Sequence, residues 1–225
     1  MKALALLAAL AQPASACLHD AMIVLDASAS MDRSVHGGTQ TRMEDGRAAL
    51  FRILPRLTEA RRIGLVTYGP GGGHSCDSVI LRVAPTADAA PLLAAVADTA
   101  PGGSTPLVAA VARAAAALGD DPATVVLVTD GNDTCGGRPC EAGARMAEAR
   151  PDLTVHVIGF HYARHLSFID RSSGGTNYDS VARCLAERTG GLYVTARTAE
   201  GLIDALTRTL GCVMGGRPAR GAGRG

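Results

Sequence analysis

Oxygen-bearing side chains follow the first strongly apolar run of the chain. The run "AMIVL" leads into Asp26, and Ser28 and Ser30 follow at alternate positions. A short apolar run, partly β-branched and ending in such a turn, is typical of a buried strand. The pattern therefore predicts one carboxylate and two hydroxyl groups together at the end of one strand.

Two further segments carry oxygen side chains in similar positions. A second apolar run, "ATVVLVT", leads into Asp130, and Thr105 lies in "GGSTPL" at the start of a predicted helix. Two carboxylates and three hydroxyls, without histidine or cysteine, are ligands that favour Mg²⁺, with Mn²⁺ or Ca²⁺ as alternatives. Because hydroxyl ligands are neutral, the bound cation keeps positive charge and one position can pass to an incoming carboxylate.

Strands and helices are expected to alternate along the chain. We predict strands at 21–27, 62–69, 79–83, 123–131, 153–160 and 192–196. We predict helices at 43–57, 87–99, 105–119, 140–152, 180–191 and 199–211, the first interrupted by Pro55 and the third ended by Gly119. The alternation predicts an α/β fold: a doubly wound, mostly parallel six-stranded sheet with one antiparallel edge strand and helices on both faces.

The predicted sheet brings the oxygen side chains together. Doubly wound sheets bind ligands at the carboxyl ends of their strands, where the strand order reverses. In the common order the strand before Asp26 and the strand before Asp130 are neighbours at that point. We therefore expect both carboxylates, the two serines and Thr105 to converge at one edge.

This set of residues resembles the metal-ion-dependent adhesion site of the von Willebrand factor A-domain family. The resemblance rests on Asp26-x-Ser28-x-Ser30, Thr105, and Asp130 in "TDG", and it spans roughly residues 20 to 212. It implies Mg²⁺ or Mn²⁺ at these five residues and a protein partner that donates a Glu or Asp carboxylate. Ala29 stands where the family commonly has glycine.

Other features of the same region resemble bacterial secreted or periplasmic members of that family. They are the segments "TDGNDTCGGRPC" and "CLAERTGG". The resemblance implies an extracytoplasmic, metal-dependent adhesion or assembly module that has no catalytic activity. Within the first segment, Asp133 either holds a water beside the metal or faces solvent.

Two other functions are compatible with these residues. In a metal-dependent hydrolase, Ser28 or Ser30 would be a nucleophile, but the chain has no G-x-S-x-G turn. His161 and His165 have the spacing of the zinc-binding pattern H-E-x-x-H, but no glutamate follows His161. The second alternative is a structural A domain without metal function, which the presence of all five oxygen residues disfavours.

The N-terminus has the parts of a secretory signal peptide. Lys2 precedes an apolar run, and Ala14-Ser15-Ala16 is a cleavage signal, so residues 1–16 are expected to be removed. We expect a domain over 17–212, a disordered Gly/Arg-rich tail over 213–225, and a periplasmic or secreted protein; a lipoprotein anchored at Cys17 is the alternative. The net charge of +1 gives no general attraction to nucleic acid or membranes.

The chain contains six cysteines, an even number that favours disulfides in an exported protein. We expect Cys17 and Cys212 to pair because they bracket the folded region. The other four leave the pairing open between a local Cys135–Cys140 bond and the combination of Cys76–Cys135 with Cys140–Cys184.

The segment at residues 161–180 is long for a connection between a strand and a helix. It contains Tyr162, Phe168 and Tyr178 in a chain with few aromatic residues. We hypothesise that this segment selects the partner; a mobile insertion is the alternative.

Overall fold

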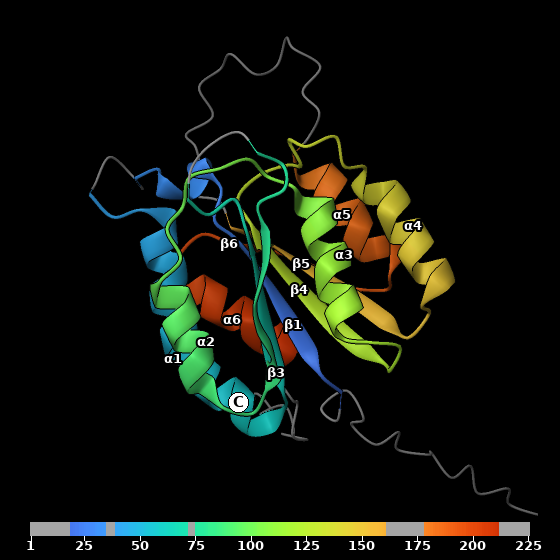
Figure 1. Cartoon of the computed structure of the whole chain (residues 1–225), viewed down its shortest axis with the longest axis horizontal. Helices are drawn as coiled ribbons and strands as arrows, with labels where there is room; N and C mark the ends of the chain where they lie inside the picture. The colour runs from blue at the N-terminus through green and yellow to red at the C-terminus, as the bar shows by residue number, and fades with distance from the viewer. Residues whose placement is uncertain (1–18, 35–38, 72–74, 161–177, 212–225) are drawn as a thin grey trace, which may run out of the picture.

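A six-stranded sheet forms the centre of the protein (Figure 1). The computed structural model describes residues 19–34, 39–71, 75–160 and 178–211. The strands are β1 (Ala21–Asp26), β2 (Ile63–Tyr68), β3 (Val79–Thr86), β4 (Ala123–Thr129), β5 (Leu153–Phe160) and β6 (Tyr193–Ala196). Their order is β3-β2-β1-β4-β5-β6, with only β3 antiparallel to its neighbour, which confirms the predicted topology.

Helices cover both faces of the sheet, also as predicted (Figure 1). One face carries α1 (Arg42–Ala60), α2 (Ala89–Ala97) and α6 (Ala199–Leu210); the other carries α3 (Leu107–Ala117), α4 (Pro139–Ala149) and α5 (Tyr178–Arg188). The six residues of β1 are all buried, and alternate ones face opposite layers: Ile23 packs in the α1 layer and Val24 in the α3 layer. This double burial explains why β1 and β4 are continuously apolar.

Helix α1 differs from its prediction at Pro55. We expected the proline to interrupt the helix, but α1 continues through it to Ala60. Proline at this position removes the hydrogen bond to the carbonyl of Phe51, whose side chain is on the exposed side of the helix. Water can replace that bond, so the helix continues. Gly119 was predicted correctly as a helix end, since it follows α3 with a φ of 65°.

Two disulfides cross-link the described residues. They join Cys76 to Cys135 and Cys140 to Cys184, which confirms one of the two predicted pairings; the local Cys135–Cys140 bond was wrong. The first bond links the β2–β3 loop to the loop after β4, and the second links α4 to α5. Such bonds are typical of proteins from oxidising compartments.

Several predictions concern residues outside the described ranges. They include the signal peptide at 1–16, the Cys17–Cys212 pair, the segment at 161–177 and the tail at 213–225. Among the helices that are described, none is long and apolar enough to cross a membrane.

His156 on β5 gives the fold a dependence on pH. Its Nδ1 accepts the backbone N–H of Leu192 at 2.9 Å, and burial, followed by the charge of Arg61, lowers its pKa from 6.5 to about 4. Between these two pH values the unfolded chain binds a proton that the folded chain does not, so stability falls as the pH falls.

Lowering the pH from 7 to 4.5 should therefore cost the wild type about 1–2 kcal/mol more than it costs His156→Gln, after allowance for partial exposure. Glutamine can still accept the Leu192 N–H but does not titrate. Urea unfolding at both pH values measures the difference, and identical losses in the two proteins would refute it.

Candidate metal centre

The strand ends bring the two predicted carboxylates to one edge of the sheet. Strands β1 and β4 are parallel neighbours with Leu25 opposite Val128, so Asp26 lies one residue and Asp130 two residues beyond this last pair. Asp26 is completely buried, and the Asp130 side chain is only 2% exposed. Two carboxylates removed from water in this way need hydrogen bonds or a cation to offset the lost hydration.

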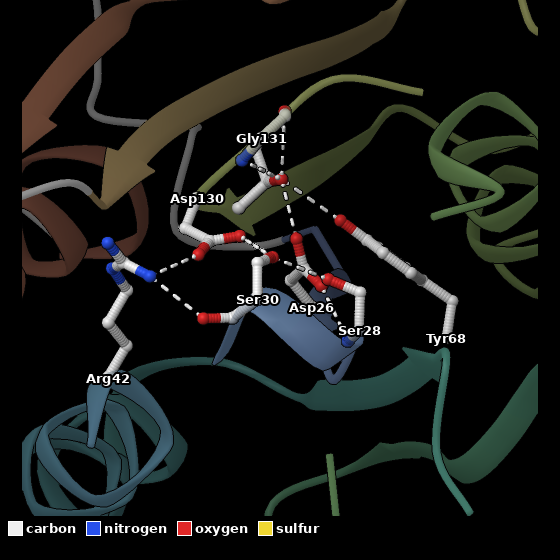
Figure 2. Close-up of polar contacts among 8 residues, drawn as sticks. Asp26, Ser28, Ser30, Arg42, Tyr68, Asp130 and Gly131 are labelled. Atoms are coloured by element: carbon white, nitrogen blue, oxygen red, sulfur yellow. Dashed lines mark hydrogen bonds and ion pairs between the residues drawn. The ribbon is translucent and has the colours of Figure 1, made fainter. Parts of the chain in front are cut away.

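Hydrogen bonds connect four of the five predicted residues (Figure 2). The hydroxyl oxygens of Ser28 and Ser30 are 3.0 Å apart, and the Ser30 hydroxyl donates to Asp130 Oδ1 at 2.5 Å. The backbone N–H of Ser28 donates to Asp26 Oδ1 at 2.8 Å. The Asp-x-Ser-x-Ser turn is thus linked to Asp130 through the Ser30 hydroxyl.

Thr105, the fifth predicted residue, borders an open cleft beside the serines. Its N–H donates to Thr134 Oγ1 at 2.9 Å and its carbonyl accepts the N–H of Thr134 at 3.0 Å, which fixes the loop before α3. The cleft has a volume of about 500 Å³, and its lining consists of Ser28, Ala29, Ser30, Cys76, Gly103, Ser104, Thr105 and Thr134. The structure therefore places all three predicted hydroxyl residues around one solvent-accessible space.

Two further hydroxyl groups, those of Thr129 and Tyr68, lie on the buried side of Asp26. The Thr129 hydroxyl donates to Asp26 Oδ2 at 2.7 Å and accepts from the Tyr68 hydroxyl at 3.1 Å (Figure 2). Burial, and next the negative charge of Asp26, raise the pKa of Tyr68 well above its usual value. Tyr68 is thus a permanent donor. Sequence reasoning missed this series of hydrogen bonds, although Tyr68 and Thr129 both end strands at the same edge of the sheet.

Backbone contacts of glycine position the serine turn. Gly69 follows β2 with a φ of 77°, and a Cβ there would lie 2.8 Å from the backbone N and Cα of Ser28. Gly103 donates its N–H to the Gly69 carbonyl and accepts the N–H of Ala29. Only glycine allows three backbone segments to approach this closely.

Asp133 has a role that was not predicted for it. Its carboxylate accepts the backbone N–H groups of Val108, Cys135 and Gly137 at 2.8 to 2.9 Å. These bonds hold the start of α3 and the loop after β4. Asp133 is thus a structural support for the loop that bears Thr134, rather than the water-binding or solvent-facing residue that we expected.

An arginine that sequence reasoning did not identify also contacts the site. Arg42, the first residue of α1, donates from Nη1 to Asp130 Oδ2 at 3.0 Å and to the Ser30 carbonyl at 2.8 Å (Figure 2). Its side chain is 18% exposed. No local motif marks this residue, because the contact depends on how α1 packs beside the end of β4.

The donor set fits a hard divalent cation. The Ser28 N–H donates to Asp26 Oδ1 and the Thr129 hydroxyl to Asp26 Oδ2; carboxylate oxygens have further lone pairs, and the serine hydroxyls border the open cleft. Among the described residues, no three side chains of the His, Cys, Asp and Glu types gather into a metal-binding group. A cation at this edge would therefore depend on hydroxyl ligands, which suits Mg²⁺ better than softer metals.

Comparisons with known proteins agree with this architecture. The model of the von Willebrand factor type A domain matches residues 21–132. The uncharacterized protein YwmC of Bacillus subtilis is 24% identical over 188 residues, which are 78% of this chain and 76% of that protein.

Solved structures have a similar fold at low sequence identity. An aerotolerance-related membrane protein from Bacteroides fragilis is 16% identical, with a TM-score of 0.59 over 85% of this chain and 98% of that chain. The PilB minor pilin from Streptococcus sanguinis is 17% identical, with a TM-score of 0.61 over 84% of this chain and 60% of that chain. These likenesses show the fold, and the family match covers residues 21–132, which resemble the von Willebrand factor type A domain.

Proposed function

We propose that this protein is an extracytoplasmic binding module that holds a divalent cation, Mg²⁺ in the first place, and captures a carboxylate of a protein partner. The cation ligands are Asp26, Ser28, Ser30, Thr105 and Asp130. The observation that carries the proposal is the chain of contacts from Ser28 through Ser30 to Asp130 beside an open cleft.

The cation would act as a Lewis acid that attracts one oxygen of the partner's Glu or Asp. The chain's own residues prepare its place. Thr129 and the Ser28 N–H fix both oxygens of Asp26, and the Ser30 hydroxyl orients Asp130. The cleft beside Thr105 leaves room for the partner's side chain.

Several observations support a role in protein binding outside the cytoplasm. The von Willebrand factor type A domain is a general protein-interaction fold. The two disulfides suit an oxidising compartment, the periplasm or the cell exterior. A non-catalytic function is supported by the contacts of Ser28 and Ser30, whose described hydroxyl partners are each other and Asp130 rather than a histidine base.

Isothermal calorimetry with Mg²⁺ and Mn²⁺ on the disulfide-bonded protein tests the proposal. The wild type should bind about one ion, and Asp130→Ala should lower the affinity by about 100-fold or more, because it removes one of only two anionic ligands. Asp121→Ala is the matched control, since it removes an exposed carboxylate beside the opposite end of β4. Equal affinities for the Asp130→Ala and Asp121→Ala variants would place the ion elsewhere.

The partner's chemistry is tested with the metal-loaded protein. A glutamate blocked at both its amino and α-carboxyl groups should bind, whereas the equally blocked glutamine, which lacks the side-chain charge, should not. A folded wild type that takes up neither ion, with or without the blocked glutamate, would instead support the structural A domain without metal function.

A further inference from the structure

The Arg42 guanidinium is a positive charge built into the proposed metal centre. It contacts Asp130 Oδ2, whereas Asp130 Oδ1 faces the Ser30 hydroxyl (Figure 2). The two oxygens of one carboxylate are thus divided between the arginine and the cluster of hydroxyls. Arg42 and a bound cation therefore both draw on the negative charge of Asp130.

The capped start of α1 fixes the backbone position of Arg42, whereas the helix dipole does not favour a positive charge there. Thr41 and Glu44 form a capping box that fixes the start of α1. An arginine in the first turn is unfavourable for the helix itself, because the N-terminal end of a helix carries positive potential. The contact with Asp130 offsets this cost, so the charge serves the site rather than the helix.

The formal charge of the metal-bound site reaches zero only when a carboxylate binds as well. Asp26, Asp130 and Arg42 together carry a formal charge of −1, and the exposed neighbours Asp32 and Arg33 cancel each other. A divalent cation changes the sum to +1, and a carboxylate returns it to zero. Without Arg42 the metal alone would already neutralise the site.

A buried donor of the same side chain adds to the positive potential. Arg42 Nε is inaccessible to solvent and has no hydrogen-bond partner among the described residues. An unpaired buried donor is unfavourable and leaves its partial positive charge uncompensated. Metal binding without an additional anion would increase this imbalance in a place that water hardly reaches.

We propose that Arg42 makes the binding of the metal and of the partner's carboxylate interdependent. In the presence of Arg42 the cation binds weakly alone and tightly together with a carboxylate. This inference rests on the proposed function and adds how the same site is regulated: the metal-bound state is favoured where an acidic partner is present. Linkage requires that the metal raises carboxylate affinity by the same factor.

Calorimetric titration with Mn²⁺ tests the proposal, with and without saturating acetate at constant ionic strength. Acetate should strengthen Mn²⁺ binding to the wild type about tenfold or more. Arg42→Gln should bind Mn²⁺ about tenfold more tightly without acetate, and acetate should change that affinity less than threefold. Arg42→Lys keeps the charge and should restore the wild-type acetate effect.

Arg52→Gln is the matched control, because it removes one positive charge from an exposed position on the same helix. Thermal unfolding in chelator shows whether each variant is folded. Equal Mn²⁺ affinity and an equal acetate effect in Arg42→Gln and wild type would overturn the role of Arg42 and leave the metal site standing. If acetate does not change the Mn²⁺ affinity of the wild type, the coupling between metal and carboxylate binding is refuted, whatever the variants show. Absence of Mn²⁺ binding in every protein, with and without acetate, would overturn the proposed function together with this inference.

Discussion

Asp26→Asn is expected to raise the melting temperature of the metal-free protein by about 3–8 °C while Mg²⁺ binding is lost. Asp26 is completely buried, and no cation among the described residues forms an ion pair with it. A buried carboxylate without a counter-charge is unfavourable, and Asp130 nearby adds repulsion. The amide keeps the shape and removes both costs.

The surrounding hydrogen bonds can accommodate asparagine. Its oxygen accepts the Ser28 N–H as before, its nitrogen donates to the Thr129 hydroxyl in place of the Gly131 N–H, and that hydroxyl can donate to the Gly131 carbonyl at 3.2 Å. Differential scanning calorimetry in chelator and metal titration measure the two effects. Asp152→Asn, an exposed change just before β5, is the control and should leave both unchanged. A lower melting temperature for Asp26→Asn would show that the charge is compensated within the protein.

Gly69→Ala is expected to destabilise the protein by about 3 kcal/mol and to weaken Mg²⁺ binding at least tenfold. The substitution combines two unfavourable effects. A left-handed backbone at φ 77° disfavours alanine, and its Cβ would lie 2.8 Å from the Ser28 backbone and the Ser104 carbonyl. The serine turn must then move, and Ser28 and Ser30 with it.

Gly71→Ala is a matched control for this prediction. Gly71 also has a positive φ, of 84°, but no atom of the residues that the structure describes lies within 4 Å of a Cβ at that position. The Gly71→Ala variant should lose about 1 kcal/mol of stability, because alanine disfavours the positive φ, and should bind Mg²⁺ like the wild type. Urea unfolding and calorimetry give both quantities. If the two alanine variants have the same metal affinity, Gly69 does not position the site.

The arrangement of the carboxylates could be predicted because it follows from topology. Parallel strands end at the same edge, so any residue that follows β1 or β4 must lie at that edge. The alternating apolar segments located both strands, and the structure confirmed that β1 and β4 are adjacent. That these residues bind a metal remains a prediction.

The contacts that refine the site were not predictable in the same way. Arg42 reaches Asp130 from a helix whose packing angle no local pattern encodes. Asp133 was expected to hold a water beside the metal or to face solvent, yet its position beside three backbone N–H groups decided its role. The approach of Gly69 to Ser28 brings together two segments distant in sequence, which no local pattern predicts.

The two disulfides have a consequence for the behaviour of the domain under tension. A partner pulling on the metal would load the carboxyl ends of β1 and β4, next to the Cys76–Cys135 bond that joins two of the surrounding loops. The bonds close segments with sequence separations of 59 and 44 residues, which correspond to roughly 200 and 150 Å of extended chain. These two segments cannot extend even when the sheet unfolds, as long as the disulfides are intact. A mechanically unfolded molecule would therefore extend less than one without these bonds and would keep the two cross-linked segments close together for refolding.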